Sequence, residues 1–162
     1  MTPLVSLALI TLLQLFPHYR EAHPRHWHIQ HWAIEVDTHR FTGAKSCRLE
    51  RERVSYRREA LVFRFAEHID TSGATYRIDA GTPQSAKADL VTLAKLGFAL
   101  YSNDLDNPTG GIVRIPIARL ESARSVWIQP RTDHYPVEFP IAGLAAALDS
   151  ERAAGCTDAA FD

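Results

Sequence analysis

The run LVFRFA at residues 61–66 alternates large apolar side chains with smaller or polar ones. Successive side chains of a strand point to opposite faces of a sheet, so its leucine and two phenylalanines share one face. After a polar loop with the turn signal TSG at residues 71–73, the run ATYRI at residues 74–78 alternates in the same way. Together the two runs predict a β-hairpin.

Other short runs extend this pattern along the chain. Further strands are predicted at residues 32–36, 98–101, 112–117 and 126–128, and the charged run at residues 47–56 is expected to form a solvated strand or a short ribbon. Two short helices are predicted, one near residues 85–96 with leucines three positions apart, and one near 141–153 with apolar residues at helical spacing. The sequence therefore predicts a mainly β fold, an antiparallel sandwich or barrel-like sheet, with two short helices.

Length and charge narrow the functional classes. The chain has 162 residues and a formal net charge of −1, which indicates one domain. A nucleic-acid-binding domain would be expected to carry a clustered positive surface, and the near-neutral balance argues against one.

The N-terminus carries the longest apolar run, PLVSLALITLLQLF at residues 3–16. It is shorter than the roughly 20 residues of a membrane span and fits the apolar part of a secretory signal peptide. We expect a signal peptide at 1–22, a His-rich arm at 23–31 and a β-rich domain at 32–162. The mature protein would then be periplasmic or secreted, without a stable membrane span. The alternative is a helix that is buried in the fold or retained as an anchor.

The chain has two cysteines, Cys47 and Cys156. Export through an oxidising compartment favours a disulfide between them. Such a bond would join the end of the chain to an early strand, and closing so long a loop is worth about 4–5 kcal/mol in the chain-entropy model. Two unpaired thiols are the alternative.

Histidines are dense just after the apolar run. The segment HPRHWHIQH carries His23, His26, His28 and His31, and imidazole is a common metal ligand. In an extended segment His26 and His28 share one face, while His23 would become the mature N-terminal residue if cleavage followed Ala22. These four residues are the candidate ligands of copper or zinc. The alternative is an arm that binds no physiological metal, in which case no cofactor is expected.

No motif for nucleophilic, phosphate-binding or zinc-protease chemistry is present in the sequence. We therefore expect a non-enzymatic domain that binds a protein or a cell-envelope component and no nucleic acid. The candidate contact regions are the loops at residues 103–111 and 131–135, and Trp127 would point outward from its strand. The candidate contact residues are Asp104, Asp106, Asn107, Trp127 and His134.

The tail VEFPIAGLAAAL at residues 137–148, followed by Cys156, is similar to the close of the invasion-associated locus B family. Trp32 and the apolar leader also resemble that family, although its mid-chain cysteine pair is absent here. The resemblance implies a small exported bacterial protein with a β-sandwich-like domain in the periplasm. It implies no catalytic residue.

Overall fold

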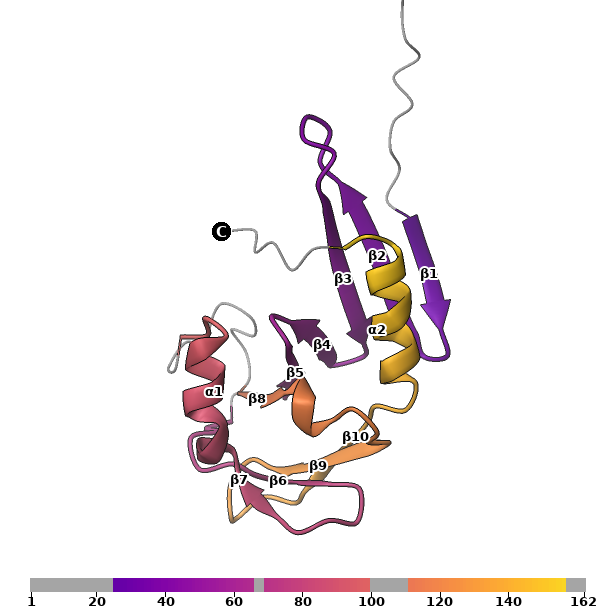
Figure 1. Ribbon diagram of the computed structural model, residues 1–162. Coiled ribbons are helices and arrows are strands. Elements are labelled where there is room, and N and C mark those ends of the chain that lie inside the picture. Colours follow the sequence, from indigo (N-terminus) through magenta and orange to yellow (C-terminus); the bar gives the residue numbers. More distant parts are fainter. Residues whose placement is uncertain (1–24, 66–68, 100–110, 157–162) are drawn as a thin grey trace, which may run out of the picture.

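The computed structural model describes residues 25–65, 69–99 and 111–156, which form two antiparallel sheets and two α-helices (Figure 1). The first sheet has six strands, hydrogen-bonded in this order: β1 (Arg25–Ile29), β2 (Trp32–Thr38), β3 (Lys45–Arg51), β4 (Val54–Arg57), β5 (Ala60–Arg64) and β8 (Ile112–Pro116). The second has four: β10 (Val137–Pro140), β9 (Ser125–Gln129), β6 (Thr75–Ile78) and β7 (Gln84–Ser85). The mainly β fold is confirmed, as a sandwich-like pair of sheets; the described strands form no closed barrel.

The predicted hairpin of residues 61–66 and 74–78 is wrong. β5 pairs with β4 and β8 in the first sheet, whereas β6 pairs with β7 and β9 in the second. Apolar alternation determines which face of a strand is buried, but it carries no information about which strand lies beside it. The chain passes from one sheet to the other between the two runs.

The charged run at residues 47–56 forms the ribbon, not the single strand, of its two expected forms. It spans the end of β3 and most of β4, which pair with each other, and Glu52 in the turn between them has a φ of 49°. Of the strand predicted at residues 98–101, Phe98 and Ala99 belong to no strand, and residues 100–101 lie outside the described residues. The guanidinium of Arg114 lies 5.3 Å from the centre of the Phe98 ring, and such a contact requires no strand pairing.

Both predicted helices are confirmed. The first is α1 (Leu90–Lys95), preceded by a 3₁₀ turn over Ala86–Asp89, and the second is α2 (Leu144–Ala153). α2 packs on β2 and β3, where the Trp32 indole donates a hydrogen bond to the Ala142 carbonyl just before the helix, at 3.1 Å. No helix in the described part of the chain is both long and apolar enough to cross a membrane.

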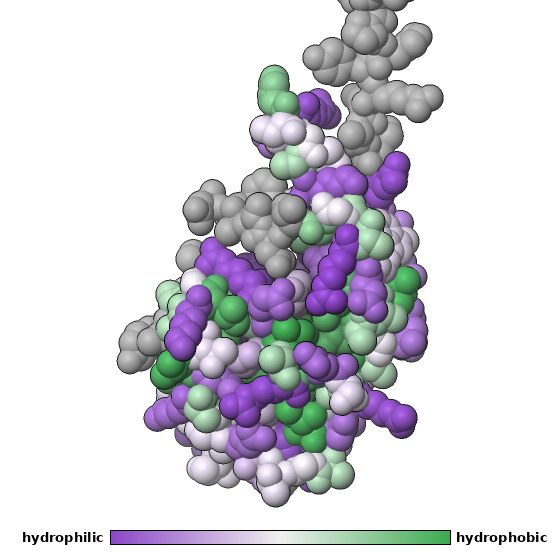
Figure 2. Space-filling model, in the orientation of Figure 1, coloured by the Kyte–Doolittle hydropathy of each residue, from purple (hydrophilic) through white to green (hydrophobic). Residues whose placement is uncertain are grey.

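A single hydrophobic core joins both sheets and α2. Trp32 and Ile34 are fully buried, as expected from their alternation. The Phe63 ring of the first sheet meets the Phe139 ring of the second edge to face, with ring centres 5.2 Å apart. The inner face of the six-stranded sheet is therefore covered by α2 over β2 and β3 and by the second sheet near β5. Hydrophilic side chains cover much of the visible surface, with apolar ones between them (Figure 2).

A buried charge lies between the second sheet and the 3₁₀ turn before α1. The Asp89 side chain is 1% exposed and lies 2.6 Å from the Arg119 guanidinium. Its other oxygen accepts a 2.6 Å hydrogen bond from the Tyr76 hydroxyl. Burial, followed by the hydrogen bond and charge of Asp89, raises the pKa of the Tyr76 phenol above its ordinary value, so this hydroxyl remains a donor. Arg119 also donates to Gln84 at 2.8 Å.

Gly111 lies where the chain enters β8. Its carbonyl accepts a hydrogen bond from the Phe65 amide, and a Cβ at this position would overlap the Ile69 carbonyl oxygen and the Thr71 methyl group. We expect Gly111→Ala to lower the free energy of unfolding by about 1–3 kcal/mol, because backbone must move to make room. Gly73→Ala is the control, since its added Cβ meets nothing within 4 Å. Urea unfolding measures both variants. Equal midpoints for Gly111→Ala and Gly73→Ala would contradict the prediction.

Candidate binding face

The second sheet turns one face to the core and the other outward. On β9, Val126 and Ile128 are fully buried, whereas Trp127 between them is only half-buried. On the neighbouring β6, Tyr76 points inward and Arg77 is exposed. The same two-residue period that builds the core thus places Trp127 and Arg77 on the outer face.

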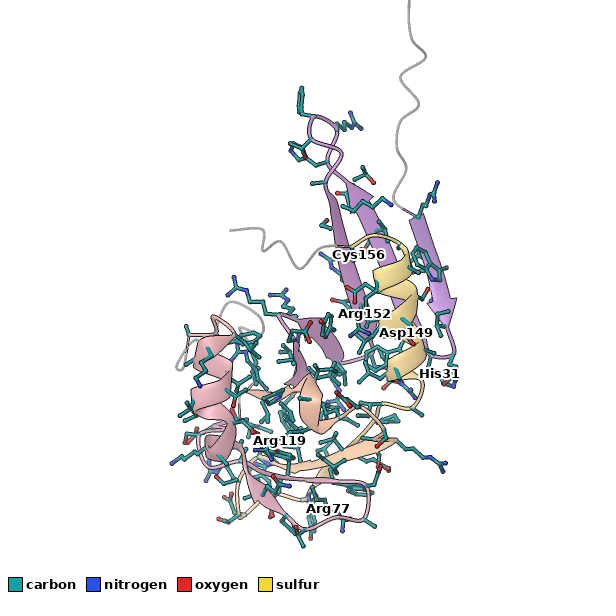
Figure 3. The ribbon with its side chains drawn as sticks, viewed as in Figure 1. His31, Arg77, Arg119, Asp149, Arg152 and Cys156 are labelled. Carbon is teal, nitrogen blue, oxygen red and sulfur yellow. A yellow bond between two sulfur atoms is a disulfide. The ribbon has the colours of Figure 1, made fainter. Side chains whose placement is uncertain are left out.

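The sheet register aligns three of these outward residues in a row. Trp127 lies opposite Arg77 of β6 on one side and opposite Glu138 of β10 on the other. The Arg77 guanidinium lies 5.1 Å from the centre of the indole ring, within the range of a cation–π contact. Trp127 is therefore a large aromatic side chain held between a positive and a negative residue. Arg77 can be located on the second sheet at the bottom of Figure 3.

The loop between β9 and β10 borders this row. The Gln129 side-chain amide donates to the carbonyl oxygens of Thr132 and His134, at 3.3 and 3.0 Å, and thereby closes the loop. Asp133 pairs with Arg131 and with the His134 ring. The hydrogen bond from His134, with a smaller part from Arg131, lowers the pKa of Asp133 below its ordinary value.

Tyr135 follows in the same loop and is 93% exposed. We use "binding face" for Arg77, Trp127, Glu138 and the loop at residues 131–135. It offers two aromatic side chains for packing, together with charges of both signs. These are groups that recognise a partner by contact and charge.

Two predicted contact residues, Trp127 and His134, lie on this one hairpin. Asp104, Asp106 and Asn107 lie outside the described residues. Sequence reasoning missed Arg77 and Glu138 as members of the face. Alternation alone placed Arg77 on the polar side of its strand, but only the pairing of β6 with β9 brings it to Trp127.

The histidine cluster is described in part. His26 and His28 are exposed on one face of β1, with ring centres 4.7 Å apart, and His31 lies just after that strand (Figure 3). Residues 25–29 of the segment pair with β2, which places His26 opposite Glu35. Glu35 also forms a 3.6 Å ion pair with Arg48. His23 lies outside the described residues, so the four-histidine metal site remains a prediction.

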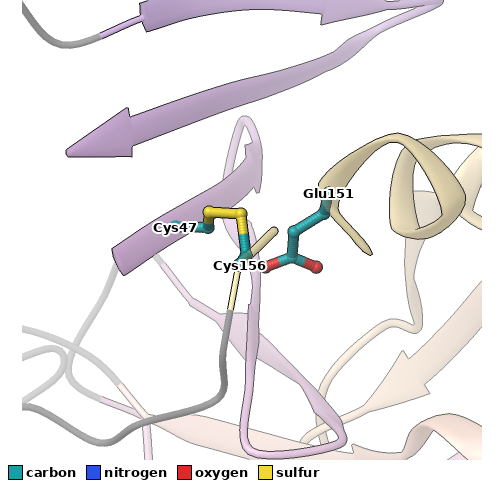
Figure 4. A group of neighbouring side chains, drawn as sticks. All are labelled: Cys47, Glu151 and Cys156. Atoms are coloured by element: carbon teal, nitrogen blue, oxygen red, sulfur yellow. A yellow bond between two sulfur atoms is a disulfide. The ribbon is translucent and has the colours of Figure 1, made fainter. Parts of the chain in front are cut away.

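The predicted disulfide between Cys47 and Cys156 is confirmed. It ties β3 to the chain just beyond α2, and the Glu151 side chain from the last turns of α2 lies beside it (Figure 4). The two sulfurs and a Glu151 oxygen all lie within 4.8 Å of one another. Among the described residues, this is the one group of three potential metal ligands that lie so close together. Sequence reasoning had considered the cysteines without Glu151.

Comparisons of this chain with protein-family models, with curated proteins and with solved structures find no match.

Proposed function

We propose that this chain is an exported, non-enzymatic binding domain that recognises a protein of the cell envelope through the binding face. The observation that carries the proposal is the row Arg77–Trp127–Glu138 on the outer side of the second sheet. Trp, Tyr and Arg are enriched among the residues that dominate protein–protein binding energies. All three occur on this face, in Trp127, Tyr135 and Arg77.

The chemistry of the face describes its partner. Arg77 already lies over the Trp127 ring, which reduces the area available for stacking a flat sugar and leaves the indole for side-chain contacts. The partner segment would bring an apolar or aromatic group to Trp127, an acidic group toward Arg77 and a basic group toward Glu138. Such charge complementarity sets the orientation of the partner and excludes wrong ones.

Export is proposed from three features. The apolar run at residues 3–16 fits a signal peptide, the tail resembles that of the invasion-associated locus B family, and a disulfide is typical of oxidising compartments. Periplasm or extracellular space is the compartment in which we expect to find the partner.

One exposed tyrosine and one exposed phenylalanine provide a test position on the binding face and a control position away from it. Tyr135 belongs to the face and is 93% exposed, whereas Phe41 is 96% exposed in the loop between β2 and β3. Figure 1 shows that loop at the opposite end of the molecule from the second sheet. We expect a photo-crosslinking amino acid at position 135 to capture one envelope protein in intact cells, and the same group at position 41 to capture none. Trp127→Ala in the crosslinking chain should abolish the product.

Affinity for the captured protein then provides the quantitative check. Trp127→Ala should weaken binding by about 2 kcal/mol or more, roughly 30-fold, as for a central hot spot, while Phe41→Ala should change it less than about twofold. Equal capture at positions 41 and 135, or capture that survives Trp127→Ala, would contradict the proposal. A crosslinked product made of two copies of this chain would contradict the envelope partner and indicate that the face mediates self-association.

Metal binding by His26 and His28 is a second candidate function, favoured by the contact between their exposed rings. The oxidised protein should bind copper(II) or zinc through these residues, with uptake at least tenfold weaker in His26→Ala/His28→Ala because two ligands are lost. His39→Ala is the control, since that exposed histidine contacts Thr42 in another loop. Equal metal affinity of the double variant and the control would exclude His26 and His28 as ligands.

A further inference from the structure

We propose that reduction of the Cys47–Cys156 disulfide converts this corner of the fold into a zinc site formed by Cys47, Cys156 and Glu151. The three ligand atoms lie within 4.8 Å of one another in the oxidised chain. Figure 4 shows the Glu151 carboxylate directed toward the sulfur pair. This inference is independent of the proposed binding function.

The Glu151 carboxylate is shielded from solvent at this corner of the fold. Glu151 is 7% exposed on the last turns of α2, so its carboxylate lies beside the sulfurs in a partly dehydrated setting. The two cysteines beside it are half-buried, so a reductant can reach the bond while the carboxylate remains shielded from solvent. A negative oxygen beside two sulfurs is a donor set that suits zinc.

Contacts other than the disulfide keep the ligands together after reduction. The Lys45 ammonium donates a 2.6 Å hydrogen bond to the Ala154 carbonyl, which holds the end of α2 against β3. At its other end, Trp32 and Arg51 both donate to the Ala142 carbonyl. The Trp27 indole donates to the Ser150 hydroxyl, next to Glu151, at 3.0 Å. α2 therefore remains docked, and Glu151 and Cys156 stay near Cys47.

The geometry of zinc matches this spacing. Zinc bonds thiolate sulfur at about 2.3 Å in a tetrahedron, so two thiolates on one ion lie about 3.8 Å apart. The sulfurs need to separate by only that much when their bond breaks. Zinc accepts both thiolate and carboxylate ligands, whereas copper(I) prefers sulfur alone. A water molecule would complete the coordination.

The chemical step is balanced with a dithiol as reductant. Thiol–disulfide exchange breaks the Cys47–Cys156 bond, the dithiol is oxidised to its own disulfide, and its two hydrogens end on the two cysteine thiols. Zinc binding then displaces the two thiol protons to solvent, while Glu151 binds as the carboxylate. Affinity should consequently rise with pH while the thiols still titrate.

The test compares the zinc content of the oxidised and reduced full-length protein. The disulfide is reduced with a phosphine, which takes up the oxygen of one water molecule and leaves two thiols. Native mass spectrometry and competition with a chromophoric chelator then measure zinc. We expect one additional zinc per chain on reduction. The oxidised protein retains its histidines, so any zinc that it binds is assigned to them and subtracted.

Variants on the same helix identify the ligands. Glu151→Gln should weaken the additional binding by about tenfold or more, since even partners beyond the ligand shell are worth that much. Asp149→Asn, whose side chain is 76% exposed on the same helix, should leave it unchanged. Cys47→Ser/Cys156→Ser should abolish it. Circular dichroism establishes that each variant is folded before it is loaded.

Thiol protection supplies an independent readout, because bound zinc should slow alkylation of both cysteines in the reduced wild type. Two results would overturn the proposal. One is a reduced protein that binds no more zinc than the oxidised protein. The other is a Glu151→Gln variant that binds as tightly as Asp149→Asn, which would leave a two-cysteine site without the carboxylate.

Discussion

Arg119→Ala is expected to lower the free energy of unfolding by about 3–5 kcal/mol at neutral pH. The variant removes the guanidinium that lies 2.6 Å from Asp89 and leaves that carboxylate, which is 1% exposed, with a hydrogen bond from the neutral Tyr76 hydroxyl. A buried charge without a counter-charge is much less favourable than the same charge in water. Arg119 is itself 40% exposed, so the variant creates no large cavity and the loss reports on the charge.

Arg152→Ala is the matched control. Arg152 pairs with Asp149 at 3.2 Å on the surface of α2, with both side chains more than half exposed (Figure 3). Water replaces such a pair at little cost, so the change should be about 0.5 kcal/mol or less. Urea unfolding at neutral pH measures both variants. Similar losses of unfolding free energy in Arg119→Ala and Arg152→Ala would mean that burial does not strengthen the contribution of the Asp89–Arg119 pair to stability.

The hydrogen bond from Tyr76 to Asp89 can be tested separately from the ion pair with Arg119. Tyr76→Phe removes one hydrogen-bond donor from the buried carboxylate and should be less costly, about 1–3 kcal/mol. Because Tyr76 and Arg119 share one partner, their effects should not add. An additive double variant would indicate that the two contacts stabilise the fold separately.

Cys47→Ser/Cys156→Ser is expected to lower the free energy of unfolding by about 2–5 kcal/mol. The bond spans a sequence separation of 109 residues, so its loss frees most of the described chain in the unfolded state. The native fold should persist, since α2 is held on the first sheet by Lys45, Trp27 and Trp32. The unfolded state becomes more expanded, so the dependence of stability on urea should steepen.

Urea unfolding with a metal chelator present compares the oxidised wild type, the reduced wild type and the double serine variant. The reduced wild type and the variant should have similar midpoints, both well below that of the oxidised protein. The same midpoint for all three would contradict a stabilising role for the bond. The chelator keeps the proposed zinc site empty, so this result does not depend on it.

Local patterns in the sequence were enough to predict most elements of the fold. The run at residues 61–66, the β-branched run at 112–117 and both helices were found from apolar spacing. Trp32 was correctly placed in the core by its alternation with Ile34. Spacing predicts these features because each depends on which side chains of one strand or helix share a face. Strand β1 was missed because it is short and contains polar residues.

By itself, the sequence determined the fold class, the two helices and the burial of alternating residues, all of which depend on neighbours along the chain. Only the tertiary structure decided that β5 and β6 belong to different sheets, that Arg77 lies over Trp127, and that Glu151 joins the two cysteines. Each of these brings together residues far apart in sequence. Their meeting follows from strand pairing and helix docking, because the free energy of the whole core, rather than any local pattern, selects among the possible partners.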